Sequence, residues 1–452
     1  MIYVIKRDGS KVPYTRDRII KAINGANKES TKQIPEQNVE KIVDSIEHKI
    51  QTKNEISVED IQDLVENFLM EYGYFEVAKK YITYRYKHMI RRENKRNLME
   101  TYKDIFFTPA SDMDDKRENA NINTNSPMGI MLKLGTEGAK QFLSNILPEE
   151  FEKAHAEGWL HQHDRDFSLI TWNCCQIDLL KVFHGGFSTG HGHLREPNSI
   201  RSYAALACIV VQANQNDFFG GQSINCWDTA MAEGIRKTFK NSIIEQIALS
   251  FVYTWDIKDY DEIVELGLKY VDEFDIRYLG GKETLKDILA LEYKIAKNLK
   301  NKLGGYYVFD EDEVPEILDR ANRKTVEETH QAMEAAIHNF CSLHSRAGSQ
   351  TPFSSINFGM DTTPEGRLAI KETLNAINSG LGNHETAIFP IAIFVIKDGI
   401  NYKEGDPNYD LFKYACKVSA KRLYPNFLSQ DATFNMQYYV PGNYNTYAAS
   451  MG

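Results

Sequence analysis

Two adjacent cysteines, Cys174 and Cys175, follow a histidine pair, His161 and His163, after a short interval in the sequence. Histidines two residues apart share one face of a strand, and a His-x-His pair at the end of a barrel strand can hold zinc in a hydrolase. Zinc would need further ligands on later strands, and no later segment offers an obvious set. A metal hydrolase and a buried pair of imidazoles bonded to nearby acids are therefore both open interpretations.

The cysteine pair offers a different chemistry. A thiol acts as a nucleophile or a redox group only where its surroundings control its protonation and access, and most intracellular cysteines are instead small buried apolar residues. Neighbouring side chains on a strand point to opposite faces, so at most one of the two thiols can face a given pocket. The six cysteines include no C-x-x-C pair, which indicates a reducing compartment and no thiolate zinc site.

The composition narrows the classes of partner. The 452 residues include 53 Lys or Arg and 63 Asp or Glu, a net charge of -10, so the chain has no positive field to attract a nucleic acid. The N-terminus is charged where a signal peptide would be apolar, and the longest apolar runs, 204–211 and 388–396, are too short to cross a bilayer. We predict a cytoplasmic protein with neither a nucleic-acid nor a membrane partner.

The elements that position these residues fall into two parts. Residues 2–14 predict a hairpin around a tight turn, and apolar residues then recur at helical spacing, with Ser57 and Asp60 as a helix start. A last helix from Phe75 enters the charged run 91–97, so we predict domains at 1–95 and 96–452.

The second part alternates helical and strand patterns, which predicts α/β architecture with parallel strands. Its clearest segments are strands at 352–359 and 389–396, helices at 148–158, 364–381 and 410–423, a strand or turn at 159–166, a glycine-rich loop at 185–192, and a helical excursion at 257–325.

Several cations surround the first turn and the start of the first helix. Arg16, Arg18 and Lys21 follow the basic turn closely, and cations beside the free N–H groups of a helix start can hold phosphate. A basic hairpin that simply packs on a helix is the alternative.

The same segment resembles the ATP-cone, the regulatory domain that binds ATP or dATP at the front of many ribonucleotide reductases. The resemblance covers residues 1–95 and is carried by Val4-x-Lys6-Arg7-Asp8-Gly9, Lys21-Ala22-Ile23 and Val77-Ala78-Lys79-Lys80-Tyr81-Ile82-x-Tyr84-Arg85. It implies that ATP or dATP binds as an allosteric effector. Lys6, Arg7 and Lys21 would contact the phosphates, and the backbone from Val4 through Asp8 to Gly9 would lie beside the nucleotide.

A series of ordered motifs in the rest of the chain resembles the anaerobic ribonucleoside-triphosphate reductases. The series includes Ser126-Pro127-Met128-Gly129, His161-x-His163-Asp164, Asn173-Cys174-Cys175, Gly220-Gly221-Gln222, Ser345-Arg346-Ala347-Gly348-x-Gln350-x-Pro352-Phe353, Phe389-Pro390 and Lys421-Arg422-x-Tyr424-Pro425. The resemblance implies a glycyl-radical enzyme in which the small, mostly helical ATP-cone with its hairpin precedes an incomplete ten-stranded α/β barrel.

The resemblance also implies an activity and its residues. Ribonucleoside triphosphates would be reduced to 2'-deoxyribonucleoside triphosphates by radical chemistry, with formate as the reductant. Cys174 would donate a proton and electrons on one face of the ribose, Asn173 and His161 would line the pocket, and Met451 would lie near the reacting sulfur of a thiyl cysteine. A dry, oxygen-free site is needed because water and oxygen would quench the radical.

The chain departs from the family at one point. The thiyl cysteine of the family follows a Met-Gly pair, and here Met451-Gly452 are the last two residues. The glycyl-radical loop and a four-cysteine zinc site would belong to a missing C-terminal part, so we expect the chain alone to be inactive and assign it no metal ligand. The alternative is a non-catalytic, nucleotide-responsive protein with a degenerate half-barrel.

The partners implied by the resemblance are a radical-SAM activating enzyme, dNTP effectors and further copies of the chain in a homodimer or higher oligomer. In the family, dNTP effectors bind at the interface between copies, to which residues 199–215 would contribute.

Overall fold

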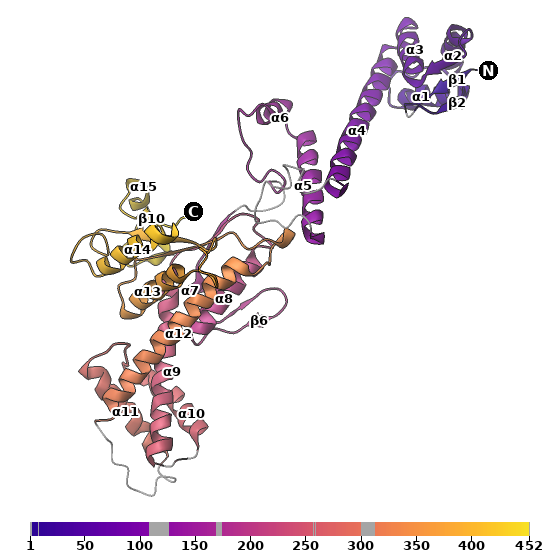
Figure 1. The fold of residues 1–452 in the computed structure, drawn as a ribbon. Coiled ribbons are helices and arrows are strands. Elements are labelled where there is room, and N and C mark those ends of the chain that lie inside the picture. The colour runs from indigo at the N-terminus through magenta and orange to yellow at the C-terminus, as the bar shows by residue number, and fades with distance from the viewer. Residues whose placement is uncertain are drawn as a thin grey trace. The chain divides into compact units, whose positions relative to one another are not determined.

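The computed structural model describes residues 2–7, 9–107, 126–168, 174–255, 257, 259–299 and 312–451 (Figure 1). The chain divides into two compact units, residues 1–108 and 109–452. Among the described residues, no helix combines the length and the apolar character that a membrane crossing requires.

The first unit contains a small sheet in the order β2-β1-β3. Strands β1 (Tyr3–Ile5) and β2 (Lys11–Pro13) are antiparallel, which confirms the predicted hairpin, and β3 (Glu55–Ser57) pairs with β1 in parallel. Gly9 lies in the turn with a φ of 79°, a left-handed conformation that glycine adopts without strain.

Helices pack around this sheet, and their bounds are α1 (Arg16–Lys28), α2 (Glu36–Ile50), α3 (Val58–Glu71) and α4 (Phe75–Phe107). The apolar residues predicted to share helix faces are buried in one core, as Ile23, Ile42 and Val65 illustrate. The Ser57 hydroxyl accepts the N–H of Asp60 at 3.0 Å, so α3 starts at the predicted cap. Helix α4 continues through residue 95, and the predicted domain boundary at that residue stays a prediction.

The second unit is built on a sheet whose described strands are all parallel and follow the chain order: β4 (Cys175–Ile177), β7 (Gln222–Ile224), β8 (Ser354–Phe358), β9 (Ile391–Ile396) and β10 (Asn426–Ser429). The predicted α/β class with parallel strands is confirmed. These strands make a five-stranded sheet, so a ten-stranded barrel stays a prediction.

The helices between the strands are α7 (Leu179–Phe183), α8 (Ile200–Asn214), α9 (Trp227–Trp255), α12 (Val314–Ser342), α13 (Pro364–Ser379) and α14 (Tyr409–Arg422). Helices α5 (Pro127–Ile146) and α6 (Glu149–Ala156) precede the sheet, and α15 (Thr433–Met436) follows it. The core of the unit includes Trp227, whose indole N–H donates to the Thr373 hydroxyl at 3.0 Å.

The predicted helical excursion consists of α10 (Tyr260–Tyr270) and α11 (Lys282–Asn298), which pack on the far ends of α9 and α12, away from the sheet (Figure 1). The glycine-rich loop forms a short antiparallel pair, β5 (Phe187–Ser188) with β6 (His193–Leu194).

One buried carboxylate ties the start of α9 to the end of β8. Asp228 is 1% exposed, and its Oδ2 accepts the backbone N–H groups of Gly359, Met360 and Asp361 at 2.8 to 3.0 Å. Burial raises the pKa of Asp228 to about 6, with a further contribution from the nearby charge of Asp361, while the backbone bonds oppose the rise. The carboxylate therefore provides the acceptor for three donors that would otherwise be buried without partners.

We predict that Asp228→Ala lowers the free energy of unfolding by more than about 3 kcal/mol, because a buried donor without a partner costs roughly 1–3 kcal/mol. Asp272→Ala is the control, because Asp272 pairs with Lys240 at the surface and its side chain is 80% exposed. That variant should change the free energy by less than about 1 kcal/mol. Urea denaturation of both variants measures the difference, and equal losses would contradict the role given to Asp228.

Candidate functional site

The first unit contains a pocket with a volume of about 150 Å³ between the hairpin and helices α1, α3 and α4. Its charged lining residues are Lys6 and Arg18, and Tyr14, Gln62 and Tyr81 add polar groups to a largely apolar wall. A cationic edge on an apolar wall suits a ligand that combines a phosphate chain with a flat ring system.

Of the residues predicted to hold a nucleotide, some line this pocket and others do not. Val4 and Lys6 line the pocket, whereas Lys21 is exposed on α1 and does not line it. Gly9 lies in the turn, where its N–H donates to the Lys6 carbonyl at 3.0 Å. Asp8 lies outside the described residues.

Arg18 and Gln62 also line the pocket. Arg18 is one of the cations near the helix start that the sequence offered for phosphate, although the resemblance gave it no contact, and Gln62 had no predicted role. Arg18 and Ala22 are four residues apart on α1 and both line the pocket. Lys21 lies three residues after Arg18, so helical spacing alone does not separate the two cations, and the packing of α1 decides between them. Gln62 comes from α3, and no pattern in the sequence connects it to the hairpin.

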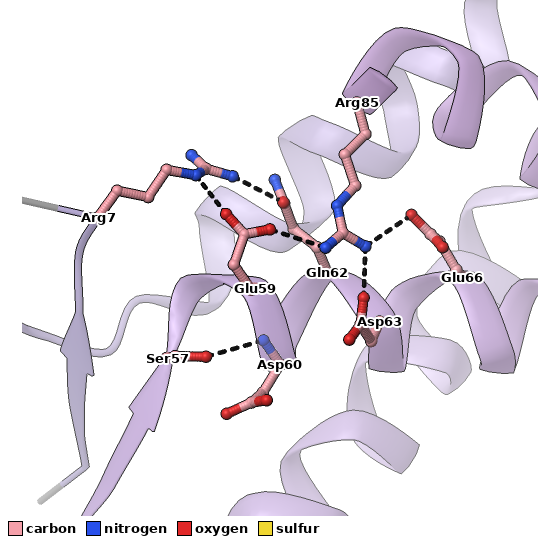
Figure 2. A network of polar contacts seen from close by, with 8 residues as sticks. All are labelled: Arg7, Ser57, Glu59, Asp60, Gln62, Asp63, Glu66 and Arg85. Atoms are coloured by element: carbon pink, nitrogen blue, oxygen red, sulfur yellow. Dashed lines mark hydrogen bonds and ion pairs between the residues drawn. The ribbon is translucent and has the colours of Figure 1, made fainter. Parts of the chain in front are cut away.

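Arg7 does not line the pocket and is held by side chains of α3 (Figure 2). Its Nε donates to Glu59, and its Nη2 donates to Gln62 Oε1 at 2.8 Å. The other oxygen of Glu59 accepts from Arg85 of α4 at 2.7 Å, and Arg85 also pairs with Asp63 and Glu66. One carboxylate therefore joins the hairpin turn to α4.

In the second unit, the cysteine pair lies at the edge of the sheet where the parallel strands begin. Cys174 precedes β4 and is exposed, while Cys175 is the first residue of β4 and is half-buried. The Sγ of Cys175 accepts from Asn214 Nδ2 at 3.0 Å, and burial raises the pKa of this thiol. The two cysteines thus have distinct surroundings.

Met451 lies at the same edge. The backbone N–H of Cys175 donates to the Gly221 carbonyl at 3.1 Å, and a Cβ built on Gly221 would lie 3.4 Å from Met451 Sδ. Gly221 therefore lies next to both the cysteine segment and Met451. Cys174, which precedes Cys175, and Met451 are both predicted for catalysis, and they come from opposite ends of the unit to the same edge of the sheet.

Polar side chains on β7 and β8 hold the residue before Met451. The Ser450 carbonyl accepts from the Ser223 hydroxyl at 3.1 Å, the Ser355 hydroxyl at 3.0 Å and Asn357 Nδ2 at 3.2 Å, and the Ser450 N–H donates to Asn357 Oδ1 at 2.9 Å. Ser223 pairs with Ser355, and Asn357 lies two residues further along β8, so all three side chains share one face of the sheet. All three are buried.

The histidines lie in a turn rather than a strand. His161 and His163 are both exposed, their ring centroids lie 6.1 Å apart, and the ring of His155 lies 5.8 Å from that of His161. No group of three or more His, Cys, Asp or Glu side chains suited to a metal ion occurs among the described residues. No hydrogen bond joins His161 to Cys174 in the described part of the chain, and Asn173 lies outside it.

A buried arginine, to which the sequence argument gave no role, lies just before β8. The Arg346 guanidinium is stacked 4.0 Å from the ring centroids of both Phe219 and Phe353. Burial lowers the pKa of Arg346 to about 10, and the charges of Asp164 and Asp166 oppose this shift, so the guanidinium stays charged at neutral pH. Phe219 lies shortly before β7, and Phe353 lies directly before β8. The stack therefore lies next to the edge of the sheet where these strands begin.

We predict that Asn357→Ala makes hydrogen exchange of the Ser450 amide at least about tenfold faster, because it removes the acceptor of that N–H group. Ser355→Ala is the matched control, because it removes one donor to the Ser450 carbonyl and leaves the acceptor of the amide in place. Exchange measured by mass spectrometry on peptides that contain Ser450 compares the two. Equal acceleration in both variants would show that Asn357 has no special part in holding this segment.

Family models match both parts of the chain. The ATP cone domain matches residues 2–90, and the anaerobic ribonucleoside-triphosphate reductase family matches residues 118–452. The first of these segments contains the pocket with Lys6, and the second contains the complete sheet with Cys174 and Met451.

Curated relatives and a solved structure are also similar to the chain. The anaerobic ribonucleoside-triphosphate reductase of Escherichia coli (strain K12) is 28% identical over 449 residues, which cover 98% of this chain and 53% of the relative. The corresponding protein of Salmonella typhimurium is 27% identical over 448 residues with the same coverage. A crystal structure of the anaerobic ribonucleotide reductase from Thermotoga maritima in complex with dATP and CTP aligns with 77% of this chain and 50% of that chain, at 10% identity and a TM-score of 0.43.

The chain spans about half the length of the curated relatives it matches. Within the chain, the reductase family matches most of the residues, from before the first cysteine to the last residue of the sequence. The chain therefore belongs to the anaerobic ribonucleoside-triphosphate reductase family.

Proposed function

We propose that the chain takes part in the anaerobic reduction of ribonucleoside triphosphates, with ATP or dATP as allosteric effectors in the first unit. The observation that carries this proposal is the convergence of Cys174, Gly221 and Met451 at one edge of the parallel sheet. The Cys174 thiol is exposed, so a substrate at this edge could reach the sulfur.

In this proposal the reaction replaces the 2'-hydroxyl of the ribose by hydrogen. Formate supplies two electrons and leaves as carbon dioxide, and the hydroxyl leaves as water, so that formic acid and a ribonucleoside triphosphate yield a deoxyribonucleoside triphosphate, carbon dioxide and water. Cys174 gives its thiol proton to the departing hydroxyl. A radical-SAM activating enzyme, dNTP effectors and a second copy of the chain complete the proposed assembly.

The surroundings of the two thiols favour Cys174 for this role over its neighbour. Cys175 already accepts a hydrogen bond from Asn214 through its sulfur, and its raised pKa keeps the thiol protonated and unreactive. Cys174 is exposed and adjacent.

We predict that CTP slows alkylation of Cys174 by iodoacetamide in the full chain, because a substrate at the sheet edge would cover the thiol. Cys416 is also exposed but lies on α14, so its rate should not change. Mass spectrometry of peptides after timed labelling gives both rates. Unchanged labelling of Cys174 at saturating CTP would contradict the proposed substrate site, and together with ATP binding it would favour the non-catalytic, nucleotide-responsive alternative.

For the effector site, we predict that Lys6→Ala weakens ATP binding to the full chain by about tenfold or more, because a charge-assisted contact with phosphate is lost. Lys21→Ala is the control. It removes an exposed cation of α1 that does not line the pocket, and it should weaken binding by less than about twofold. Isothermal titration calorimetry measures both constants. A larger effect of Lys21→Ala than of Lys6→Ala would contradict a phosphate site in this pocket and would favour a phosphate contact at Lys21.

A further inference from the structure

The carboxylate of Glu59 is shared between two arginines from different elements. One oxygen accepts from Arg7 at the hairpin turn, and the other accepts from Arg85 on α4 (Figure 2). Burial alone would raise the pKa of Glu59, but the bonds and charges of Arg7 and Arg85 outweigh it and leave the pKa below its ordinary value. Glu59 is therefore ionised at neutral pH while it binds both guanidinium groups.

The same unit contains a second clamp with the same spacing. Arg16 of α1 pairs with the carboxylates of α2, and Arg85 of α4 pairs with those of α3; the two sets are Glu40, Asp44, Glu47 and Glu59, Asp63, Glu66. Glu40 and Glu59 occupy equivalent positions, and their side chains are 46% and 45% exposed. The difference is that Glu59 binds one further arginine, Arg7.

That extra arginine lies beside the nucleotide pocket. Arg7 follows Lys6, which lines the pocket, and Arg7 Nη2 donates to Gln62, which also lines it. An arginine at this position is suited to phosphate, because its planar fork of donors matches phosphate oxygens. In the structure this fork is occupied by Glu59 and Gln62 instead.

We propose that Glu59 is a positioning residue that competes with the phosphates of a nucleotide for Arg7 and so sets the affinity of the pocket. The inference rests on the proposed nucleotide function of the first unit. When a phosphate binds Arg7, the carboxylate of Glu59 keeps Arg85 as its one arginine partner. Arg85 still pairs with Asp63 and Glu66 at the same time. Occupation of the pocket thereby changes the ion pairs that reach α4, the last helix of the unit.

The test compares Glu59→Gln with Glu40→Gln in the full chain by titration calorimetry with ATP. Removing a partly exposed competing ion pair should tighten binding by about two- to fivefold in E59Q, while E40Q should leave the affinity unchanged. The gain should disappear in an Arg7→Gln background, because no arginine is then released. A purely structural role of Glu59 would not depend on Arg7 in this way.

The outcomes separate the two proposals. A wild-type chain that binds no ATP overturns both of them. A chain that binds ATP with equal affinity in the wild type and in E59Q, or more weakly in E59Q, overturns the competition alone. Should E59Q not fold, Glu59→Asp replaces it, because the shorter side chain cannot reach Arg7 and Arg85 together and should also tighten binding.

Discussion

The parallel register of the sheet in the second unit is the constraint on which the candidate site depends. Cys175 pairs with Gln222, and Gln222 pairs with Ser354, so the first residues of three successive strands lie side by side. A shift of one residue would turn every side chain to the other face of the sheet. It would carry Ser355 away from the Ser450 carbonyl and would move Cys174 away from the glycine beside Met451.

Much of the fold could be predicted because its signals are local. The hairpin, the cap at Ser57, the helices of the first unit and the two long buried strands β8 and β9 all follow from patterns of neighbouring residues. Strands β4 and β7 are only three residues long, and a pattern with a period of two is not readable over so short a segment. The segment at 159–166 is a turn for the same reason: its alternating residues continue too briefly to specify a strand.

The site was predicted less completely because its contacts are not local. Val4 and Lys6, which the resemblance placed beside the nucleotide, both line the pocket. The choice between Arg18 and Lys21 depends on how α1 packs, which the sequence does not show. Met451 reaches Gly221 across most of the unit, and Asn357 lies in a strand of mixed polar and apolar residues, where an asparagine carries no signal of its own. The roles assigned to Cys174, Asn173, His161 and Met451 stay predictions.

The repeated spacing of the carboxylates on α2 and α3 has a consequence for how the first unit folds. Each helix places three acids three or four residues apart on one face, and like charges at those intervals disfavour an isolated helix. Arg16 and Arg85 relieve this repulsion from outside, since each belongs to a different helix. Neither α2 nor α3 therefore reaches its full stability until its partner has docked, which couples the folding of α2 to α1 and that of α3 to α4.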